Sequence, residues 1–543
     1  MEKDQVNENP TPQGVTRREA LKLSGMALGG VVLGSGMIGQ TTVKALAADS
    51  NCQEQCPPAP ACTWGDAVQA QQYSYFDGLD EFYPIDQSTS TTIPRLGRNE
   101  MRITFMGSCI PLNLRRVQQM MSIFVEVGWD DDKQMPADQF VFDCGSGVCT
   151  NYTAMNVNYG RMDKIFLTHL HGDHMSDLVH IYCFGPSSDR KSPLYVWSHG
   201  NSGVTAPGGK RYDDGVKSFC SHLRKACRWH SESFSFQTTR YYGYPKPGEV
   251  KKKWGLPCDP QPVSDDRYDD AYAMIPIELD WTKYGKKAGD NIAYHNRDTG
   301  VKITHFPVIH ARQGSIGYKL EWLTPDGDIL SMIFTGDTKP EYHSIEQARN
   351  GGKGVDVFIH EMGLPAEVWA FMNLGLDAPP PDGTPGWDAA VNEIKMVQNS
   401  SHSPQGAFGY VLSQITPRPR LTVATHMPVS DATVACAKKS VQEHFPNEVV
   451  YQGNNPGNGD VRMTWSFDRM VITVSRDAII EQKANVSDFC NPAATNLPSG
   501  DAYPAKYHNP DGSGDPFAQI ERKTEIPSCN RETDACNFRE DGY

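Results

Sequence analysis

The feature that most constrains this chain is the stretch of residues 164–177, which reads K-I-F-L-T-H-L-H-G-D-H-M-S-D. Residues 165–167 form a short apolar run of the kind that fits a buried strand. Alternate side chains of an extended backbone share one side. His169 and His171, which lie just past the run, are therefore placed to bind one metal ion together.

The turn after this pair supplies two more ligand-type side chains. Gly172 permits a change of direction, which turns Asp173 and His174 toward a second ion nearby. Imidazole and carboxylate donors suit Zn²⁺, with iron and manganese as the alternatives. A His-rich surface loop without function is the competing interpretation. Four ligand-type residues within six positions, directly after an apolar strand, favour a two-metal site.

The pattern H-x-H-x-D-H resembles the signature of the metallo-β-lactamase superfamily, and Thr168 just before it and Leu170 within it look most like the ribonuclease Z and arylsulfatase branch. This resemblance implies an α/β fold with four layers, αββα, and two bound Zn²⁺ ions. It also implies three further ligands, each at the end of its own apolar strand. The chain is similar as well to exported metallo-hydrolases of the guanitoxin-biosynthesis type, a resemblance that leaves the substrate open.

Three later strand-like runs end in ligand-type residues, in the order that the resemblance requires. His310 corresponds to the third ligand of the first ion, with His305 as the alternative. Asp337 corresponds to the carboxylate that bridges both ions, and His426 to the last ligand of the second ion. The ligand set implied in this way is His169, His171, Asp173, His174, His310, Asp337 and His426.

Other polar residues are expected around the ions. Asp143, in the sequence D-C-G-S-G, resembles an Asp-Gly turn of the family and is expected to support the histidines through hydrogen bonds. Glu361 follows His360 in a pair that resembles the start of a His-Glu-Ala-Thr motif. His402 matches a His-Ser-Thr position and is expected to donate a proton, oriented by Glu361. Asp173, Glu361 and His402 are the candidate catalytic residues, and a purely structural role for the last pair is the alternative.

The N-terminus is typical of a protein that is exported. Arg17 and Arg18 precede a mildly apolar stretch at 23–43, and Ala47 follows as the end of a small-residue cleavage site. Six glycines between residues 25 and 39 dilute the stretch, which argues against a stable membrane anchor. We therefore expect the twin-arginine export machinery as a partner, and a periplasmic or secreted protein.

The chain is expected to comprise a signal peptide at 1–47, a Cys- and Pro-containing leader at 48–98, a catalytic domain at 99–475 with a large insertion at about 185–300, and an irregular Cys-containing tail at 476–543. The insertion falls between the second and third metal motifs. Within the catalytic domain, helices are expected at 216–229 and 403–412, the second capped by Ser403. Residues 471–474 are expected to form an edge strand.

Fourteen cysteines are consistent with an oxidising compartment, where disulfides persist. The cysteines near the two ends of the chain are the candidates for disulfide bonds, and their pairing cannot be read from the sequence. These residues are Cys52, Cys56, Cys62, Cys529 and Cys536.

The net charge of −14 argues against a nucleic-acid partner, because phosphate binding needs a basic surface. With the resemblance, this predicts an exported dinuclear metal-dependent hydrolase that uses a metal-bound hydroxide on a sulfate or phosphate ester of a small molecule. A lactonase or amide hydrolase is the alternative, and a nuclease or a non-catalytic metal-binding protein fits less well. Only 26 residues separate His310 from Asp337, which leaves no room for the tRNA-gripping arm that a nuclease of the family would carry there.

Overall fold

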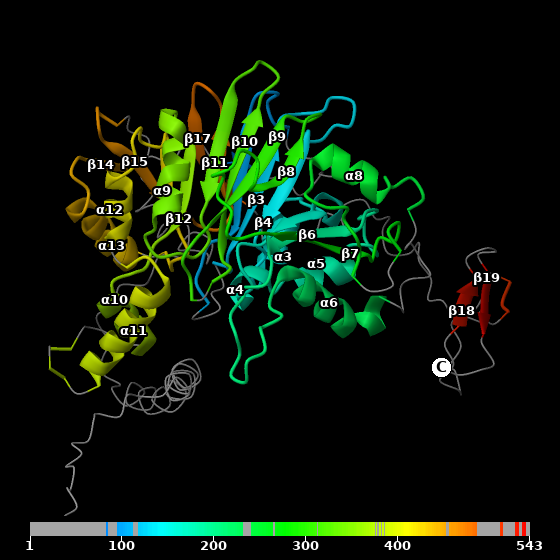
Figure 1. Ribbon diagram of the computed structural model, residues 1–543, viewed down its shortest axis with the longest axis horizontal. Coiled ribbons are helices and arrows are strands. Elements are labelled where there is room, and N and C mark those ends of the chain that lie inside the picture. The colour runs from blue at the N-terminus through cyan, green and yellow to red at the C-terminus, as the bar shows by residue number, and fades with distance from the viewer. Residues whose placement is uncertain are drawn as a thin grey trace, which may run out of the picture. The chain divides into compact units, whose positions relative to one another are not determined.

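The computed structural model describes residues 95–485, apart from 112–117, 232–240, 264–266, 312, 375, 377–379, 382, 385, 405, 430 and 452–455, together with residues 83–84, 511–513, 527–530 and 535–538 (Figure 1). The predicted signal peptide and the cysteines at 52, 56 and 62 lie outside the described residues. Among the described residues, 366–394 form one compact unit and the rest of the described chain forms the other.

The larger unit contains a nine-stranded mixed sheet. Its strands, in spatial order, are β1 (Tyr83–Pro84), β17 (Ile479–Asn485), β16 (Met470–Val474), β2 (Met101–Gly107), β3 (Ser122–Val127), β4 (Asp138–Phe142), β5 (Lys164–Phe166), β6 (Leu194–His199) and β7 (Met274–Leu279). From β17 to β4 the neighbours run antiparallel, and from β4 to β7 they run parallel.

An eight-stranded sheet belongs to the same unit. Its strands, in spatial order, are β14 (Val449–Tyr451), β15 (Val461–Trp465), β13 (Leu421–Thr425), β12 (Val357–Glu361), β11 (Ile329–Phe334), β10 (Ile316–Leu323), β9 (Val301–Pro307) and β8 (Ile292–Asn296). Strands β11, β12 and β13 are parallel, so the residues that follow them emerge at one edge of the sheet.

The main hydrophobic core lies between the two sheets. Ile123 and Val125 of β3 and Ile303 of β9 belong to this core, whereas Phe124 faces a second core on the other side of its sheet. The alternation has period two, as expected for strands. Both faces are buried, which explains why these strands read as continuous apolar runs.

Helices cover the outer faces of both sheets (Figure 1). On the nine-stranded sheet, the second core contains residues of α3 (Val148–Ala154), α5 (Leu178–Phe184) and α6 (Val216–Ala226). Beside the eight-stranded sheet lie α9 (Tyr342–Arg349), α12 (Ala407–Ser413) and α13 (Asp431–Glu443), with α12 stacking Phe408 on His360 of β12. The predicted α/β fold with four layers, αββα, is confirmed.

Short elements complete the described chain. They are η1 (Tyr159–Arg161), α4 (Gly172–Met175), α8 (Pro247–Trp254), η2 (Asn350–Gly352), and the hairpin of β18 (Pro527–Asn530) and β19 (Ala535–Phe538). In the hairpin the backbone of Cys529 lies opposite that of Cys536. Within the part of the chain that the structure describes, no helix has both the length and the apolar character to cross a membrane.

In the smaller unit, α10 (Ala366–Leu374) packs against the first part of α11 (Trp387–Ser401). The contact is formed by Ala366, Ala370, Trp387, Val391 and Ile394.

Three predictions about organisation were wrong. The segment 185–300 is not an addition outside the core, because it supplies β6 and β7 to one sheet and β8 to the other. Strand β16 is not at an edge, since it pairs with both β2 and β17. The tail from residue 476 does not begin as irregular chain, because β17 continues the nine-stranded sheet past the expected boundary at 475.

Candidate metal centre

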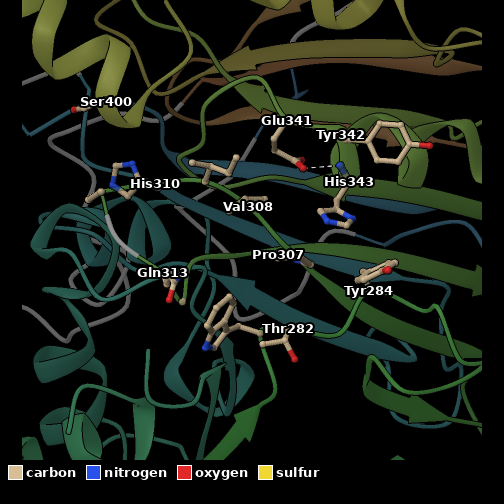
Figure 2. Close-up of a pocket in the computed structure, with 14 residues that line it drawn as sticks. Thr282, Tyr284, Pro307, Val308, His310, Gln313, Glu341, Tyr342, His343 and Ser400 are labelled. Carbon is tan, nitrogen blue, oxygen red and sulfur yellow. Dashed lines mark hydrogen bonds between the residues drawn. The ribbon is translucent and has the colours of Figure 1, made fainter. Parts of the chain in front are cut away.

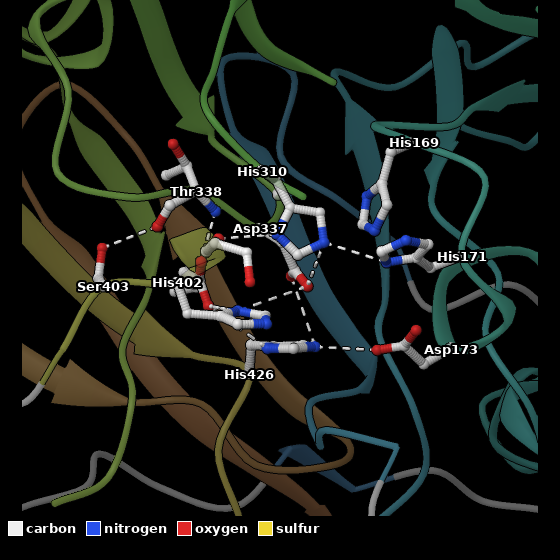
Figure 3. Close-up of polar contacts among 12 residues, drawn as sticks. His169, His171, Asp173, His310, Asp337, Thr338, His402, Ser403 and His426 are labelled. Carbon is white, nitrogen blue, oxygen red and sulfur yellow. Dashed lines mark hydrogen bonds and ion pairs between the residues drawn. The ribbon is translucent and has the colours of Figure 1, made fainter. Parts of the chain in front are cut away.

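The predicted ligands meet at one end of the two sheets (Figure 3). His169 follows β5, and His310 follows β9. Asp337 and His426 follow β11 and β13, whose parallel course brings their ends to the same edge. The ligands are far apart in the sequence, but each follows a strand, and the order of the strands in the sheets brings these strand ends close together.

Three histidines form the first cluster: His169, His171 and His310, each with one ring nitrogen within 4.8 Å of the others. The Nε2 atom of His310 lies 3.0 Å from Nδ1 of His171. The Nδ1–H of His310 donates to the backbone oxygen of Ser401 at 2.8 Å, which leaves the Nε2 lone pair free to bind an ion.

Asp173, His174, Asp337 and His426 form the second cluster, again within 4.8 Å. His426 Nε2 lies 3.1 Å from Oδ2 of Asp173 and 3.4 Å from Oδ1 of Asp337. His174 Nε2 lies 3.2 Å from the same Asp337 oxygen. All four residues are buried. Asp337 also lies 3.7 Å from Nε2 of His310 through its Oδ2, so its two oxygens face the two clusters.

Asp143 fixes the orientation of two ligands. Its carboxylate accepts hydrogen bonds from Nδ1–H of His174 at 2.7 Å and from the hydroxyl of Thr168 at 2.8 Å. Because that hydroxyl donates to Asp143, its oxygen accepts from Nδ1–H of His169 at 3.1 Å. In their neutral form both histidines therefore carry the proton on Nδ1, which leaves Nε2 as the atom that can bind an ion. The structure supports the role expected for Asp143, and Thr168 joins it.

The donor set fits metal ions. Nε2 of His169 is buried without a hydrogen-bond partner among the described residues, and the buried Nε2 of His174 and Oδ1 of Asp337 lie 3.2 Å apart without forming a hydrogen bond. An unsatisfied buried polar atom costs about 1–3 kcal/mol, so these converging atoms fit a site that holds a cation. Imidazoles and carboxylates are the donors that Zn²⁺, iron and manganese share.

The charges around the clusters point the same way. Burial lowers the pKa of His169 well below its usual value and that of His171 to about 4, which keeps both rings neutral and able to bind an ion. At the second cluster burial opposes charge on His426, but Asp337 and Asp173 outweigh it and raise its pKa to about 10. The carboxylates there thus favour a cation between them.

Glu361 and His402 flank the second cluster. Nδ1 of His402 lies 2.8 Å from Oε2 of Glu361, and the other Glu361 oxygen accepts the backbone N–H of Thr338. His402 Nδ1 is 3.9 Å from Oδ2 of Asp337, at the border of the centre. Burial disfavours charge on His402, yet the Glu361 carboxylate raises its pKa.

The backbone is strained where it positions these groups. Asp143 has a φ of 56° and His426 a φ of 60°, both in the left-handed region that non-glycine residues rarely adopt. Gly336, just before Asp337, also has a φ of 60°, and a Cβ there would lie 2.6 Å from the side chain of Thr168. A glycine at 336 therefore allows the chain before Asp337 to pass close to Thr168, which precedes His169.

Two alternatives from the sequence are decided by placement. His305 lies on β9, belongs to neither cluster, and hydrogen-bonds through its backbone to Asn291. His310 is thus the histidine at the centre. His360 stacks on Phe408 and belongs to none of the ligand groups, whereas Glu361 lies with Asp337, His402 and His426.

The prediction that a helix begins at Ser403 was wrong. α11 ends at Ser401, and α12 begins only at Ala407 after Gly406. The Ser403 hydroxyl donates to the backbone oxygen of Thr338 at 2.9 Å instead of capping a helix. His402 therefore directly follows the end of α11, and residues 402–406 separate α11 from α12. Sequence reasoning also missed Ser401, whose contribution is a backbone oxygen that no side-chain pattern reveals.

Comparisons with known proteins give local sequence matches. Ribonuclease Z of Treponema denticola is 36% identical over 59 residues, 11% of this chain and 19% of that protein. Ribonuclease BN of Enterobacter sp. is 32% identical over 103 residues, 18% of this chain and 30% of that protein, and that of Proteus mirabilis is 30% identical over 108 residues, 20% and 32%. The chain thus spans about a fifth to a third of the length of these relatives. No family model matches the chain.

Solved structures similar to this one include the metallo-beta-lactamase fold protein YhfI from Bacillus subtilis, with a TM-score of 0.38 and 14% identity over 69% of this chain and all of that one. The long form RNase Z from yeast has a TM-score of 0.41 and 12% identity, over 78% of this chain and 48% of that one. The deciding observation is that the seven expected ligands gather at one end of two packed sheets covered by helices. The chain has the metallo-β-lactamase fold.

A pocket of about 670 Å³ adjoins the centre of this metallo-β-lactamase-fold chain at His310 (Figure 2). Its lining includes Trp281 and Tyr284, from the segment between β7 and β8, and Tyr342 and His343 of α9. The segment 185–300 therefore does contribute to a pocket beside the site, although it is also part of the sheets.

Proposed function

We propose that this chain is an exported hydrolase that binds two divalent metal ions, by preference Zn²⁺, and cleaves a sulfate or phosphate ester of a small molecule. The observation that carries the proposal is the position of Asp337, whose Oδ2 lies 3.7 Å from His310 Nε2 and whose Oδ1 lies 3.4 Å from His426 Nε2. One carboxylate that faces both clusters is what a two-metal hydrolase needs to hold its ions a few ångströms apart.

Two ions bound here would lower the pKa of a water molecule and neutralise charge on the ester oxygens. The chain's own residues prepare the site for this. Asp143 and Thr168 hold His169 and His174 in the tautomer that leaves Nε2 free. Glu361 engages Nδ1 of His402, so that Nε2 is the His402 atom able to give a proton to a leaving oxygen. No serine or cysteine nucleophile is required.

The proposal is tested with the purified full-length chain loaded with zinc. Aryl sulfates, aryl phosphates, phosphodiesters and lactones are offered in parallel, with Asp337→Asn as the inactive control. We expect turnover of a sulfate or phosphate ester that Asp337→Asn abolishes. Turnover of lactones alone would show that the enzyme attacks a carbonyl carbon, not sulfur or phosphorus. Bound metal without any turnover would indicate a binding protein.

A nuclease is the second candidate, because the local sequence matches are to ribonucleases Z and BN. Two features oppose it. The net charge is −14, and β10 and β11 occupy most of the segment between His310 and Asp337, which leaves no arm there to hold tRNA. Incubation with a tRNA precursor decides between the candidates, since specific cleavage at catalytic enzyme concentrations would establish the nuclease.

We further propose that the chain leaves the cytoplasm by twin-arginine export. Arg17 and Arg18, followed by a glycine-diluted apolar stretch, support this. Replacement of both arginines by lysine should leave an uncleaved precursor in the cytoplasm. Recovery of processed protein outside the cytoplasm from that variant would contradict twin-arginine export.

A further inference from the structure

One residue belongs both to the metal centre and to the lining of the neighbouring pocket. His310 contributes Nε2 to the first cluster and also lines the pocket. The neighbouring Val308 and Ile309 form part of the pocket wall. The organic group of an ester bound at the ligand clusters can therefore extend past His310 into the pocket.

Aromatic side chains form the walls, and contacts hold two of them in place. Trp281 donates its Nε1–H to the backbone oxygen of Asn201 at 3.2 Å. The ring of Tyr284 lies 4.6 Å from that of His343, and its backbone oxygen accepts a hydrogen bond from Gln347 at 3.3 Å. Flat rings fixed in this way provide stacking surfaces at a small entropic cost.

The pocket offers little to a charged group. Glu341 is its only acid among the described lining residues, and its carboxylate accepts the backbone N–H groups of His343 and Ser344 at the start of α9. Burial lowers the pKa of His343, which keeps that ring neutral at neutral pH. The described residues that line the pocket include no lysine or arginine.

Apolar surface is exposed here beside the ligand clusters. Ile309 is 55% exposed and Tyr342 is 65% exposed, although both are large and apolar. A volume of about 670 Å³ falls within the range of pockets that bury drug-sized molecules. The pocket is too large for a single ring to fill.

We propose that this pocket binds the organic part of the ester, and that this part is an apolar aromatic ring system larger than a single ring, selected by Trp281 and Tyr284. The inference rests on the proposed function and names its substrate class. Trp281 and Tyr284 act as specificity-determining residues, because they touch the organic group and not the bond that is cleaved.

The test compares phenyl and 2-naphthyl esters of the same acid, whose leaving groups have similar acidity but different apolar area. In the wild-type chain, kcat/KM for the 2-naphthyl ester should exceed that for the phenyl ester by roughly 10- to 100-fold. Trp281→Ala and Tyr284→Ala should lower kcat/KM for the 2-naphthyl ester more than kcat/KM for the phenyl ester, and so remove most of this preference. Trp229→Ala is the matched control, since Trp229 is 80% exposed and does not line the pocket.

Binding of 2-naphthol, measured by calorimetry, judges the pocket without any turnover. We expect Trp281→Ala to weaken this binding about tenfold and Trp229→Ala to leave it unchanged. If no ester is cleaved but 2-naphthol binds in this pattern, the proposed function fails and the pocket assignment stands. Equal 2-naphthol binding by wild type, Trp281→Ala and Tyr284→Ala, or an unchanged naphthyl preference in both variants, would overturn the inference.

Discussion

The Nδ1 atom of His402 lies 2.8 Å from Oε2 of Glu361, at the border of the second ligand cluster. Glu361 is buried, and its other oxygen accepts the backbone N–H of Thr338. The backbone N–H of Thr338 therefore fixes the Glu361 carboxylate, and this carboxylate in turn orients the His402 imidazole. This couples the orientation of His402 to the position of the bridging aspartate.

His402→Ala should lower turnover without removing metal. His402 is not among the seven proposed ligands, so elemental analysis should give the wild-type metal content. If His402 protonates the leaving oxygen, kcat should fall roughly 10²- to 10⁴-fold. The loss should shrink for esters whose leaving group is a weak base. Rates over a leaving-group series measure this, with Glu361→Gln as the companion variant that keeps His402 but removes the orienting charge.

An equal loss of rate across that series would exclude the proton-donor role. A loss of metal from His402→Ala would instead make His402 a ligand, as its grouping with Asp337, Glu361 and His426 permits.

Asp337→Ala should release metal. Its two oxygens face the two clusters, so its removal takes a ligand from both ions and leaves the histidines to hold them alone. We expect close to two ions per wild-type chain and clearly fewer in the variant, measured by elemental analysis after dialysis. Asp326→Ala, which removes an exposed carboxylate in the turn before β11, is the control and should keep the full complement. Equal metal contents in the two variants would contradict the bridging role.

The ligands could be predicted from the sequence because each follows a buried strand. His310, Asp337 and His426 come directly after apolar runs, and parallel strands bring such ends to one edge of a sheet. The hydrogen bond between Asp143 and a metal-site histidine was likewise expected, from the resemblance of D-C-G-S-G to an Asp-Gly turn of the family. In both cases a local pattern of a few residues decides the geometry.

The errors arose where local composition does not determine pairing. Strand β6, L-Y-V-W-S-H, lies in a segment rich in glycine, proline and charge, so its buried Tyr195 and Trp197 were not recognised as core residues. Ser403 followed by proline is typical of a helix start, but its hydroxyl is used by the Thr338 backbone from another strand end. Such long-range partners carry no signal in the local sequence.

Gly336→Ala should destabilise the chain more than Gly327→Ala. Both glycines have positive φ, 60° and 94°, so both substitutions incur the left-handed backbone cost of about 1–2 kcal/mol. Only at Gly336 would the new Cβ meet another side chain, that of Thr168 at 2.6 Å, whereas Gly327 faces open space. Overpacking should add about 1–3 kcal/mol at Gly336. Denaturant unfolding of the metal-free chains measures the difference, and equal losses would show that Thr168 moves aside freely.

Asp468 gives the structure a pH-dependent stability away from the ions. Its buried carboxyl lies 2.9 Å from the hydroxyl of Ser108, 2.6 Å from the backbone nitrogen of Gln119 and 2.8 Å from the Asn151 amide. Burial raises its pKa from the ordinary 3.8 to about 7, although these hydrogen bonds and the charge of Arg469 oppose the rise. Lys483, the other cation near it, has a pKa lowered by burial to about 8.

The sign of the effect follows from this raised pKa. Between about pH 4 and pH 7 the folded chain holds a proton on Asp468 that the unfolded chain has released, so its contribution to the free energy of unfolding is fully present below pH 4 and is lost as the pH rises through 7. A shift from 3.8 to about 7 corresponds to about 4 kcal/mol at 1.36 kcal/mol per unit. Asp468→Asn should remove this slope, because an amide can donate to Ser108 and accept from Gln119 and Asn151 at every pH. Unfolding of the metal-free wild type and variant from pH 4 to pH 8 measures the difference, and parallel curves would mean that Asp468 is ionised throughout this range in the folded chain.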